Sequence, residues 1–375
     1  MKFRVASKEK VMFILHLPPP VHGSSIMGQY IKTSKAINET FNCKYINLGT
    51  SRTIKSIGKK SIRKYFQYAV IITEVLRALV FFKPKTCYLA ISAKGTAFYK
   101  DAVIAFIIKL FRVKLVLHYH NKGVKENSNK YINNLLYRNL FRNVKVILLS
   151  KHLYWDVEKY ISESSVYYCP NGIDDSVYNY HVKSRLDNKD VVEILFLSNL
   201  IKTKGVFVLL EACNELVKRN VNFHCSLAGA EGDISSEYLD ERIRELKLDD
   251  VVSYVGYKTD TEKNTIFNEA DIFIHPTYDD CFPLVLIEAM QYNLPIISTY
   301  EGGIPDIVVD GVTGYLVPKQ NVDELVEKMA VLITNNKLRS DMGSAARERY
   351  EKYFRIDAFE ERLKIALNKV SSGNE

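Results

Sequence analysis

The chain lacks the cysteine pattern of a secreted or zinc-binding protein. Its six cysteines are scattered singly through 375 residues, with no C-x-x-C pair. Such cysteines are typical of reduced thiols in a cytoplasmic protein, and they argue against a disulfide framework or a zinc site. The glycine fingerprint G-x-G-x-x-G is also absent, which argues against a Rossmann-type dehydrogenase.

Targeting and membrane-spanning segments are not evident either. The first residues, M-K-F-R-V-A-S-K-E-K, lead into an expected strand rather than a long apolar core, so we expect no signal peptide. The most apolar stretch, residues 68–82, is interrupted by Glu74 and Arg77. It falls short of the roughly 20 apolar residues that span a bilayer. We interpret it as a helix buried in the protein, or otherwise as a helix at a membrane interface.

Acidic residues are scarce in the first half of the chain. Residues 1–180 hold 29 Lys and Arg against 10 Asp and Glu, whereas the remaining residues hold 23 against 33, so the net charge of +9 conceals a strong asymmetry. The basic half predicts an anionic partner. The length fits two domains of ordinary size, and the hydrophobic (47%) and charged (25%) fractions are typical of soluble globular proteins.

Strands and helices alternate along most of the chain. In the first half we expect strands near 11–17, 43–48, 86–92, 113–119 and 144–149, and helices near 60–82, 96–111 and 129–142. Residues 175–190 break the alternation and are interpreted as a connector. A second alternating set runs to about residue 334, and the remaining residues are helical. This is the pattern of doubly wound α/β domains.

One strand–loop–helix–strand unit carries two acidic residues. Residues 271–277 and 295–299 are expected strands, and the segment between them begins as a loop and continues as a helix. Asp280 lies in the loop at the carboxyl end of the first strand, and Glu288 lies about one turn into the helix.

The start of this helix is a candidate anion site. Pro283 fits the first helical position, where its missing N–H is not needed. The amides of Leu284, Val285 and Leu286 are then free to bind an anion within reach of Glu288. The alternative is an ordinary amphipathic helix with a solvated Glu288.

A second loop carries three polar side chains. Strand 192–198 is followed by N-L-I-K-T-K-G and by a helix over 206–219. Asn199, Lys202 and Lys204 therefore lie between a strand's carboxyl end and a helix's amino end, where open α/β sheets bind ligands. A lysine in this place is a suitable counter-ion for phosphate. The alternative is that these lysines are only solvated.

A third loop, P-P-P-V-H-G-S-S (18–25), follows the first strand. Its prolines stiffen the chain, and Gly23 lets the backbone come close to a ligand. A helix is expected from about Ser24 to about Thr40, with free amides at its start. His22 is interpreted either as part of the site or as a solvated loop histidine.

The segment 52–66 combines basic and apolar residues. Its basic residues are Arg52, Lys55, Lys59, Lys60, Arg63 and Lys64. Each could contribute roughly 1 kcal/mol of attraction to an anionic membrane, and the alternative is a solvated helix face. Nucleic acid is not expected as a partner, because no recognition motif accompanies the charge.

Five motifs occur in the order and spacing of a known family. They are C-P-N-G-I-D (169–174), S-N-L-I-K-T-K-G (198–205), D-C-F-P-L-V-L-I-E-A-M (280–290), G-G-I-P-D-I-V (302–308) and D-G-V-T-G-Y-L-V-P (310–318). Through them the chain resembles the retaining GT-B glycosyltransferases of family four, the group 1 glycosyltransferases. The resemblance covers the whole chain and is densest over these motifs.

The resemblance implies an α/β fold of the GT-B type, with two Rossmann-like doubly wound domains facing a central cleft. Residues 1–182 would form the acceptor-binding domain, joined by a C-terminal helix of about 356–375. Residues 183–355 would bind the nucleotide sugar. The implied protein is cytoplasmic, with peripheral attachment to the inner face of the membrane as a further expectation.

The implied activity is transfer of a sugar, with retention, from a UDP- or GDP-sugar to a hydroxyl of a glycan or lipid-linked acceptor in bacterial surface polysaccharide synthesis. The nucleotide sugar is a substrate, and no cofactor or metal is expected. Two alternatives remain open. One is a non-catalytic partner protein of the same fold, and the other is a sugar-nucleotide epimerase.

The resemblance also implies roles for particular residues. Lys204 and the amides after Pro283 would stabilise the departing diphosphate, with help from Lys202, while Asp280 would hold a hydroxyl of the donor sugar and Glu288 the ribose. The other residues expected at the donor are Gly23, Asn199, Gly256, Tyr257 (at the base), Phe282, Leu284 and Val285. His120 in H-Y-H-N-K-G would contact the sugar near its reacting carbon, and it is preferred over His118.

The chain departs from the family pattern at several of these positions. Asp280 stands where the family has Glu, and Asn199 stands where it has Arg. The step N-L-P (293–295) lacks the usual Gly, and Asp306 replaces a Glu. The departures bear on site geometry and donor choice, and they are the best support for the non-catalytic alternative.

Overall fold

The computed structural model describes residues 8–50, 62–175 and 191–372. The chain divides into two compact units. Unit 1 is formed by Met1–Asn171 and Ile356–Glu375, and unit 2 by Gly172–Arg355. The predicted boundary after residue 182 and most of the predicted connector 175–190 lie outside the described residues.

Unit 1 is built on a parallel six-stranded sheet in the order β2-β1-β3-β4-β5-β6. Its strands are β1 (Lys10–Leu15), β2 (Asn42–Asn47), β3 (Thr86–Ile91), β4 (Lys114–Tyr119), β5 (Lys145–Leu148) and β6 (Val166–Tyr168). Its helices are α1 (Gly23–Thr33), α2 (Lys35–Thr40), α3 (Ile62–Arg77), the π-helix η2 (Ala78–Phe82), α4 (Gly95–Leu110), α5 (Val124–Asn127), α6 (Tyr131–Phe141), the 3₁₀ turns η3 (Lys151–Asp156) and η4 (Glu163–Ser165), and α14 (Ile356–Ser372).

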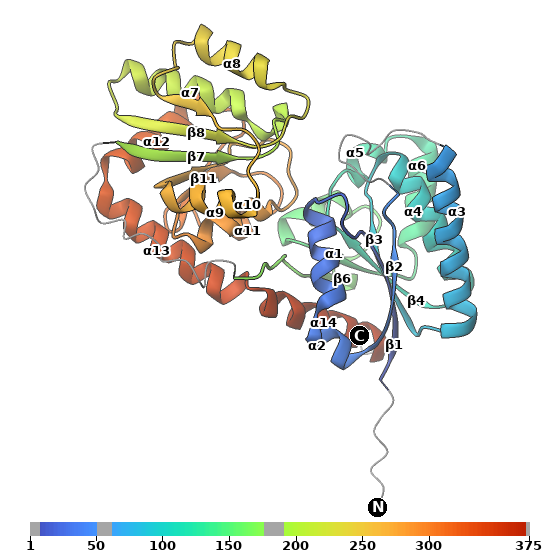
Figure 1. Ribbon diagram of the computed structural model, residues 1–375. Helices are drawn as coiled ribbons and strands as arrows, with labels where there is room; N and C mark the ends of the chain where they lie inside the picture. Colours follow the sequence, from blue (N-terminus) through green and yellow to red (C-terminus); the bar gives the residue numbers. More distant parts are fainter. Residues whose placement is uncertain (1–7, 51–61, 176–190, 373–375) are drawn as a thin grey trace, which may run out of the picture. The chain divides into compact units, whose positions relative to one another are not determined.

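Helices cover both faces of this sheet, as the apolar strand sequences require. All six residues of β3 and five of the six in β1 are buried, because a central parallel strand packs on both sides. Helices α1, α2 and α14 lie along one face, and α3, α4 and α6 lie along the other (Figure 1).

The first predicted helix is interrupted. Ser34, with φ −57° and ψ 118°, ends α1 and starts α2. Its hydroxyl accepts the Ile37 amide at 3.1 Å, which caps the second helix. The expected single helix to about Thr40 is therefore two helices.

The prediction that residues 68–82 form a buried helix is wrong. Helices α3 and η2 form a continuous 21-residue helix, Ile62–Phe82, of which only 22% of the most apolar window is buried. Because the helix begins before the apolar stretch, its length and composition would suffice to cross a membrane. The helix has about the predicted bounds, near 60–82, but the expectation that its apolar stretch is too short to span a bilayer does not hold for the whole helix.

Unit 2 repeats the plan, with a parallel sheet in the order β12-β11-β10-β7-β8-β9. Its strands are β7 (Val192–Leu197), β8 (Phe223–Ala228), β9 (Val252–Tyr254), β10 (Ile272–Ile274), β11 (Ile296–Thr299) and β12 (Gly314–Val317). Its helices are the 3₁₀ turn η5 (Lys202–Lys204), α7 (Val206–Lys218), α8 (Ser236–Glu245), α9 (Asp260–Glu269), α10 (Leu284–Gln291), α11 (Ile304–Ile307), α12 (Val322–Thr334) and α13 (Asn336–Tyr353).

Alternation along the strands divides the core of unit 2 between two faces. Ile194 and Ile274 pack with residues of α7, α8 and α12 in one cluster. Phe273, whose side chain points to the opposite face, instead contacts the ring of Phe267 on α9, with centroids 5.7 Å apart. Helix α9 therefore covers the other face of the sheet.

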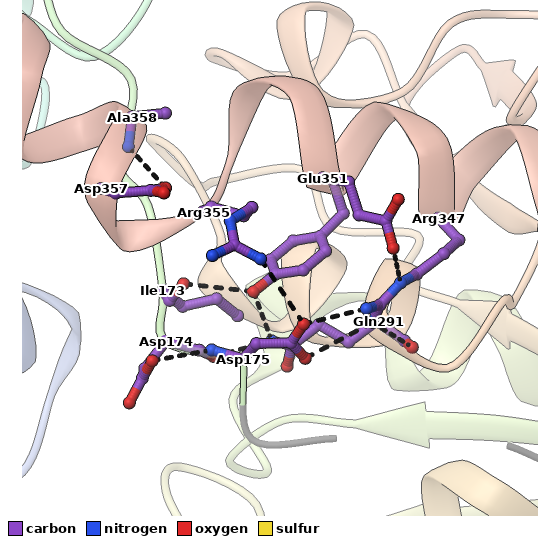
Figure 2. A network of polar contacts seen from close by, with 10 residues as sticks. Ile173, Asp174, Asp175, Gln291, Arg347, Glu351, Arg355, Asp357 and Ala358 are labelled. Atoms are coloured by element: carbon purple, nitrogen blue, oxygen red, sulfur yellow. Dashed lines mark hydrogen bonds and ion pairs between the residues drawn. The ribbon is translucent and has the colours of Figure 1, made fainter. Parts of the chain in front are cut away.

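A polar network holds the start of unit 2 against its last helix (Figure 2). On α13, Arg347 Nη2 lies 2.9 Å from Asp175 Oδ2. Gln291, the last residue of α10, donates to the carbonyl of Asp174 at 2.7 Å and to the hydroxyl of Tyr350 at 2.8 Å. The motif C-P-N-G-I-D thus has a structural role, because its end anchors the helix that carries Glu288.

Candidate functional site

Two loops of unit 2 meet at the point where the strand order of its sheet reverses. Strand β7 lies beside β10, but β8 and β9 extend the sheet on one side while β11 and β12 extend it on the other. Ligands of open α/β sheets bind at such a point, beyond the carboxyl ends of the strands. The loops that follow β7 and β10 carry Lys204 and Asp280, respectively.

Backbone contacts fix these two loops against each other. The carbonyl of Thr203 accepts the Tyr278 amide at 2.9 Å and the Thr277 hydroxyl at 3.0 Å. Gly205 has φ +86°, and a Cβ there would lie 2.1 Å from the Pro276 carbonyl oxygen. Only glycine permits both this conformation and this close approach.

Lys204 and Asp280 form an ion pair as a result. Lys204 Nζ lies 2.5 Å from Asp280 Oδ2, and the two side chains are 21% and 15% exposed. His275 Nε2 lies 3.4 Å from the same oxygen, while the Cys281 amide donates to Oδ1 at 2.9 Å. Burial alone would raise the pKa of Asp280, but the hydrogen bond from His275 and the charge of Lys204 hold it well below the usual range.

Sequence reasoning missed His275, which lies beneath this pair. The imidazole is almost completely buried, and burial lowers its pKa although the neighbouring Asp280 opposes the shift. A neutral ring can donate from Nε2 to Asp280, which leaves Nδ1 as an acceptor with no partner among the described residues. The sequence did contain a feature that could have identified this residue, because His275 directly follows an apolar strand and precedes Asp280 by five residues.

The start of α10 differs by one residue from the prediction. Pro283 is the N-cap, not the first helical residue, with φ −69° and ψ 118°. The Leu286 amide donates to the Pro283 carbonyl at 3.3 Å, so the prediction that it is free is wrong. The amides of Leu284 and Val285 remain outside the intrahelical pattern, and the helix has no side-chain cap.

The motif G-G-I-P-D packs against the loop that carries Asp280. Gly303 donates its amide to the Cys281 carbonyl at 2.7 Å. Gly302 has φ +53°, and a Cβ there would lie 2.5 Å from the carbonyl oxygen of Asp280. The second glycine-dependent contact therefore also fixes the backbone that presents Asp280.

Glu288 has a partner that the sequence did not predict. Lys263 on α9 places Nζ 2.7 Å from Glu288 Oε1, and the side chains are 30% and 20% exposed. Lys263 was missed because it lies on another helix, 25 residues earlier in the sequence. A ribose hydroxyl bound to Glu288 would share the carboxylate with this lysine.

The remaining predicted residues of unit 2 have varied surroundings. Asn199 is half-buried, and Lys202 is exposed with its amide donating to Asp233 Oδ1 at 2.8 Å. Phe282 is buried and packs on Phe354, with ring centroids 6.3 Å apart. Gly256 and Tyr257 follow β9 at the same edge of the sheet, and Tyr257 is highly exposed.

In unit 1 the loop after β1 ends in a helix cap. Gly23 is the first residue of α1 and is exposed. His22 is the N-cap, since its Nδ1 accepts the Ser25 amide at 3.4 Å and its own amide donates to the Ser25 hydroxyl at 2.9 Å. His22 is thus held by the helix rather than merely solvated.

A group of histidines follows β1 and β4 in unit 1. The rings of His118 and His120 lie 4.2 Å apart, and those of His16 and His22 lie 5.8 Å apart. Burial, with smaller contributions from His16 and His22, lowers the pKa of His120 to about 3. At neutral pH this imidazole is therefore uncharged and suited to hydrogen bonding.

His118 is the structural member of the group. It is fully buried, and its Nδ1 lies 2.6 Å from the Tyr88 hydroxyl. His120 is the more exposed of the two, and its role at the site stays a prediction. Across residues 8–50, 62–175 and 191–372, no group of three or more His, Cys, Asp or Glu is arranged to hold a metal.

The part of the chain that contains the unit 2 site is similar to a known family. Residues 179–349 match the family model described as Glycosyl transferases group 1. This segment, just under half of the chain, is similar to that family. It includes both loops of the site and most of the motifs on which the resemblance rests.

Curated relatives match over similar lengths. The chain is 28% identical over 187 residues to the putative colanic acid biosynthesis glycosyltransferase WcaL of Salmonella typhimurium, covering 48% of this chain and 45% of that protein. It is 31% identical over 160 residues to the amylovoran biosynthesis glycosyltransferase AmsK of Erwinia amylovora, covering 41% and 38%. The matches thus span about half the length of these relatives or less.

Solved structures resemble nearly the whole chain. Sucrose-phosphate synthase from Thermosynechococcus elongatus superposes with a TM-score of 0.76 at 17% identity, covering 98% of this chain and 100% of that one. Anabaena HepE in complex with UDP gives 0.72 at 18% identity, covering 96% and 100%. The predicted α/β fold with two doubly wound domains of the GT-B class is confirmed.

Proposed function

We propose that the protein is a hexosyltransferase that moves a sugar, with retention, from a nucleotide diphosphate sugar to a hydroxyl of a glycan or lipid-linked acceptor. Bacterial surface polysaccharide synthesis is the proposed setting, because similar proteins are described as making colanic acid and amylovoran. UDP is the preferred nucleotide, since HepE is known in complexes with UDP and UDP-glucose. The observation that best supports this proposal is the Lys204–Asp280 pair beside the start of α10, which has no side-chain cap.

The diphosphate is the first ligand group that this arrangement suits. Lys204 supplies a fixed positive charge, and the amides of Leu284 and Val285 supply donors at the positive end of a helix. Both are held before the reaction begins, so they can stabilise charge that develops on the departing diphosphate. In this proposal the protein needs no metal, and Lys202 adds a further exposed charge.

Asp280 and Glu288 suit the hydroxyl groups of the donor. A low pKa keeps the Asp280 carboxylate ionised as an acceptor for a sugar hydroxyl. Glu288 accepts from the ribose and exchanges part of its contact with Lys263. Asn199, Gly256 and Tyr257, at the same edge of the sheet, complete the donor site in this proposal.

In unit 1, His120 is proposed as a neutral hydrogen-bonding group for a substrate hydroxyl. Its lowered pKa prevents it from acting as a cation near pH 7. Gly23 exposes the start of α1, where the amide of a neighbouring residue could bind an anion.

The first experiment is thermal stabilisation of the protein by UDP-, GDP- and ADP-sugars, followed by calorimetry with the nucleotide that stabilises most. A ligand that binds only the folded state raises the melting temperature. We expect a UDP-sugar to stabilise the wild type, and Lys204→Ala to abolish most of the effect. Failure of every nucleotide sugar to bind would contradict the proposed function.

A non-catalytic partner of the same fold is the second candidate, and one observation favours it. Asp280 already receives three donors, from Lys204, His275 and Cys281, and it is shorter than the family's Glu. Binding of UDP-sugar without transfer to any glycan or lipid-linked acceptor would favour this candidate. Release of an isomerised nucleotide sugar or free sugar would instead indicate an epimerase.

A further inference from the structure

The helix Ile62–Phe82 of unit 1 is apolar on two opposite sides. Ile71, Val75, Ala78 and Leu79 are buried against the rest of the unit. The outward side also carries large apolar side chains, and these are exposed. Exposed apolar groups of this size often mark a surface that contacts a partner or a membrane.

The outward side carries large apolar side chains near both ends of the helix, with the exposed polar residues Thr73, Glu74 and Arg77 between them. Ile62, Phe66 and Val70 follow each other at intervals of four residues, which places them on one face, and they are 89%, 72% and 43% exposed. Val80 and Phe81 lie at the other end of the helix and are 47% and 80% exposed. We call these five residues the apolar face.

Neighbouring helices extend the exposed apolar surface. Helix α4 lies beside α3, and α6 lies beside α4, on the same side of the first sheet (Figure 1). Tyr68 ties α3 to α4, because its hydroxyl donates to the Lys100 carbonyl at 2.7 Å. The exposed large side chains of these two helices and the residue that follows α4 are Tyr99, Val103, Leu110, Phe111, Tyr131, Ile132 and Leu135.

The charges around this surface are almost all positive. Exposed basic residues on the three helices and directly after them are Arg63, Arg77, Lys83, Arg112, Arg138 and Arg142. Glu74 is the one exposed acidic residue within α3, α4 and α6. In the sequence, the basic segment 52–60 immediately precedes α3, although it lies outside the described residues.

We propose that the apolar face docks on an anionic lipid bilayer, with the helix lying in the interface and the basic residues against lipid phosphates. Apolar side chains on one face of a helix and flanking positive charges are the two features that bind such surfaces. The charge pattern favours a bilayer over a second copy of this chain, because two copies would bring like charges together. The helix does not span the bilayer in this proposal, because Ile71 and Val75 pack inside unit 1.

This inference moves the predicted membrane contact from the basic segment 52–64 to a described helix. Within that segment the structure describes only Ile62, Arg63 and Lys64, of which Ile62 and Arg63 are exposed. The apolar face can insert below the lipid headgroups, whereas positive charge alone only attracts the protein to the membrane surface. Docking does not depend on the proposed transferase activity and is measured without donor or acceptor.

The test is co-sedimentation of the full chain with vesicles of phosphatidylglycerol and phosphatidylcholine, and with vesicles of phosphatidylcholine alone. We expect binding to the anionic vesicles, and weakening by about tenfold or more in Ile62→Asp/Phe66→Asp/Val70→Asp. Ile365→Asp is the matched control, because Ile365 is an exposed isoleucine on α14, on the other face of the same sheet. It should bind like the wild type.

Salt and oligomeric state complete the test. Binding should weaken at 1 M salt, where the Debye length falls to roughly 3 Å, and Arg63→Gln/Arg77→Gln/Lys83→Gln should weaken it as well. The proposal is overturned if the wild type ignores anionic vesicles or if the triple Asp variant binds as tightly as Ile365→Asp. It is equally overturned if the triple variant only converts a wild-type dimer to a monomer in sedimentation equilibrium.

Discussion

The two units share a parallel-sheet plan, but the loops at their strand ends differ in charge. In unit 2, charged side chains form close pairs, Lys204 with Asp280 and Lys263 with Glu288. In unit 1, the loops after β1 and β4 hold histidines whose pKa values are lowered by burial. The difference indicates that unit 2 is equipped for an anionic, hydroxyl-rich ligand, whereas unit 1 offers neutral hydrogen-bonding groups.

The outer surfaces of the units differ as well. The first half of the chain, most of which forms unit 1, has a large excess of positive charge, whereas the second half has more acidic than basic residues. Unit 1 also contains the apolar face of α3 and η2. The two halves of the molecule therefore have separable tasks in this account. Each substitution below changes one unit only.

The largest effect is expected from Lys204→Ala. Removing one preorganised group that stabilises developing charge typically lowers the rate by about a hundredfold or more. Turnover with UDP-sugar should fall by that amount, while the melting temperature in the absence of ligand stays close to that of the wild type. Lys202→Ala, in the same 3₁₀ turn but exposed, is the matched control and should lose much less activity.

Near-normal turnover of Lys204→Ala would remove this lysine from the phosphate site. Equal losses in the Lys202 and Lys204 variants would show that general positive charge matters rather than the particular geometry. Vesicle binding should be the same in both variants, because neither residue lies in unit 1.

A smaller effect is expected from Glu288→Ala. Hydrogen bonds to charged groups contribute about 1.5–3 kcal/mol, so the affinity for free UDP should fall by about tenfold or more in calorimetry. Lys263→Ala is the matched control, since it removes the partner but keeps the carboxylate. If Glu288 binds ribose, Lys263→Ala should leave UDP affinity unchanged or increased, and equal losses in both variants would assign the pair a structural role.

Part of the unit 2 site can be predicted from the sequence alone, and part of it cannot. Asp280 and Lys204 are predictable because each follows a strand of a doubly wound sheet, where carboxyl ends form the binding edge. The contacts of Lys263 with Glu288 and of His275 with Asp280 are not predictable, because they depend on how α9 packs and on how the residue after β10 is buried. Pro283 is misplaced by one residue, since a proline satisfies both the N-cap and the first helical position.

The exposure of α3 illustrates a different limit. Hydropathy shows that residues 68–82 are apolar, but it does not show which of their sides the protein covers. The structure buries Ile71 and Val75 and leaves Phe66 and Val70 exposed. The fold class was predictable from alternation and motifs, whereas this surface was not.

The smallest effect is expected from pH, and it concerns unit 1. Burial lowers the pKa of His16 to about 4 and that of His120 to about 3, and it also lowers the pKa of His118. Below about pH 6.5 the unfolded chain therefore binds protons that the folded chain does not, so stability falls as the pH falls. Asp101 opposes this trend, because burial raises its pKa to about 7 and its ionisation destabilises the fold as the pH rises.

Burial also lowers the pKa of His22. Since these four histidines outnumber one aspartate, the melting temperature should decrease between pH 7 and pH 5, by roughly 5 °C. Asp101→Asn should make the decrease steeper, because the opposing contribution is lost. A melting temperature that is constant or increases on acidification would contradict the assignment of neutral, buried histidines in unit 1.

The most direct test of the account is calorimetric titration of free UDP into the wild type, Lys204→Ala and Asp280→Ala. The account assigns Lys204 to the diphosphate, which UDP contains, and Asp280 to the sugar, which UDP lacks. It predicts that Lys204→Ala weakens UDP binding by about tenfold or more, whereas Asp280→Ala binds UDP nearly as well as the wild type but no longer transfers sugar. Equal loss of UDP affinity in both variants, or a wild type that does not bind UDP, would contradict it.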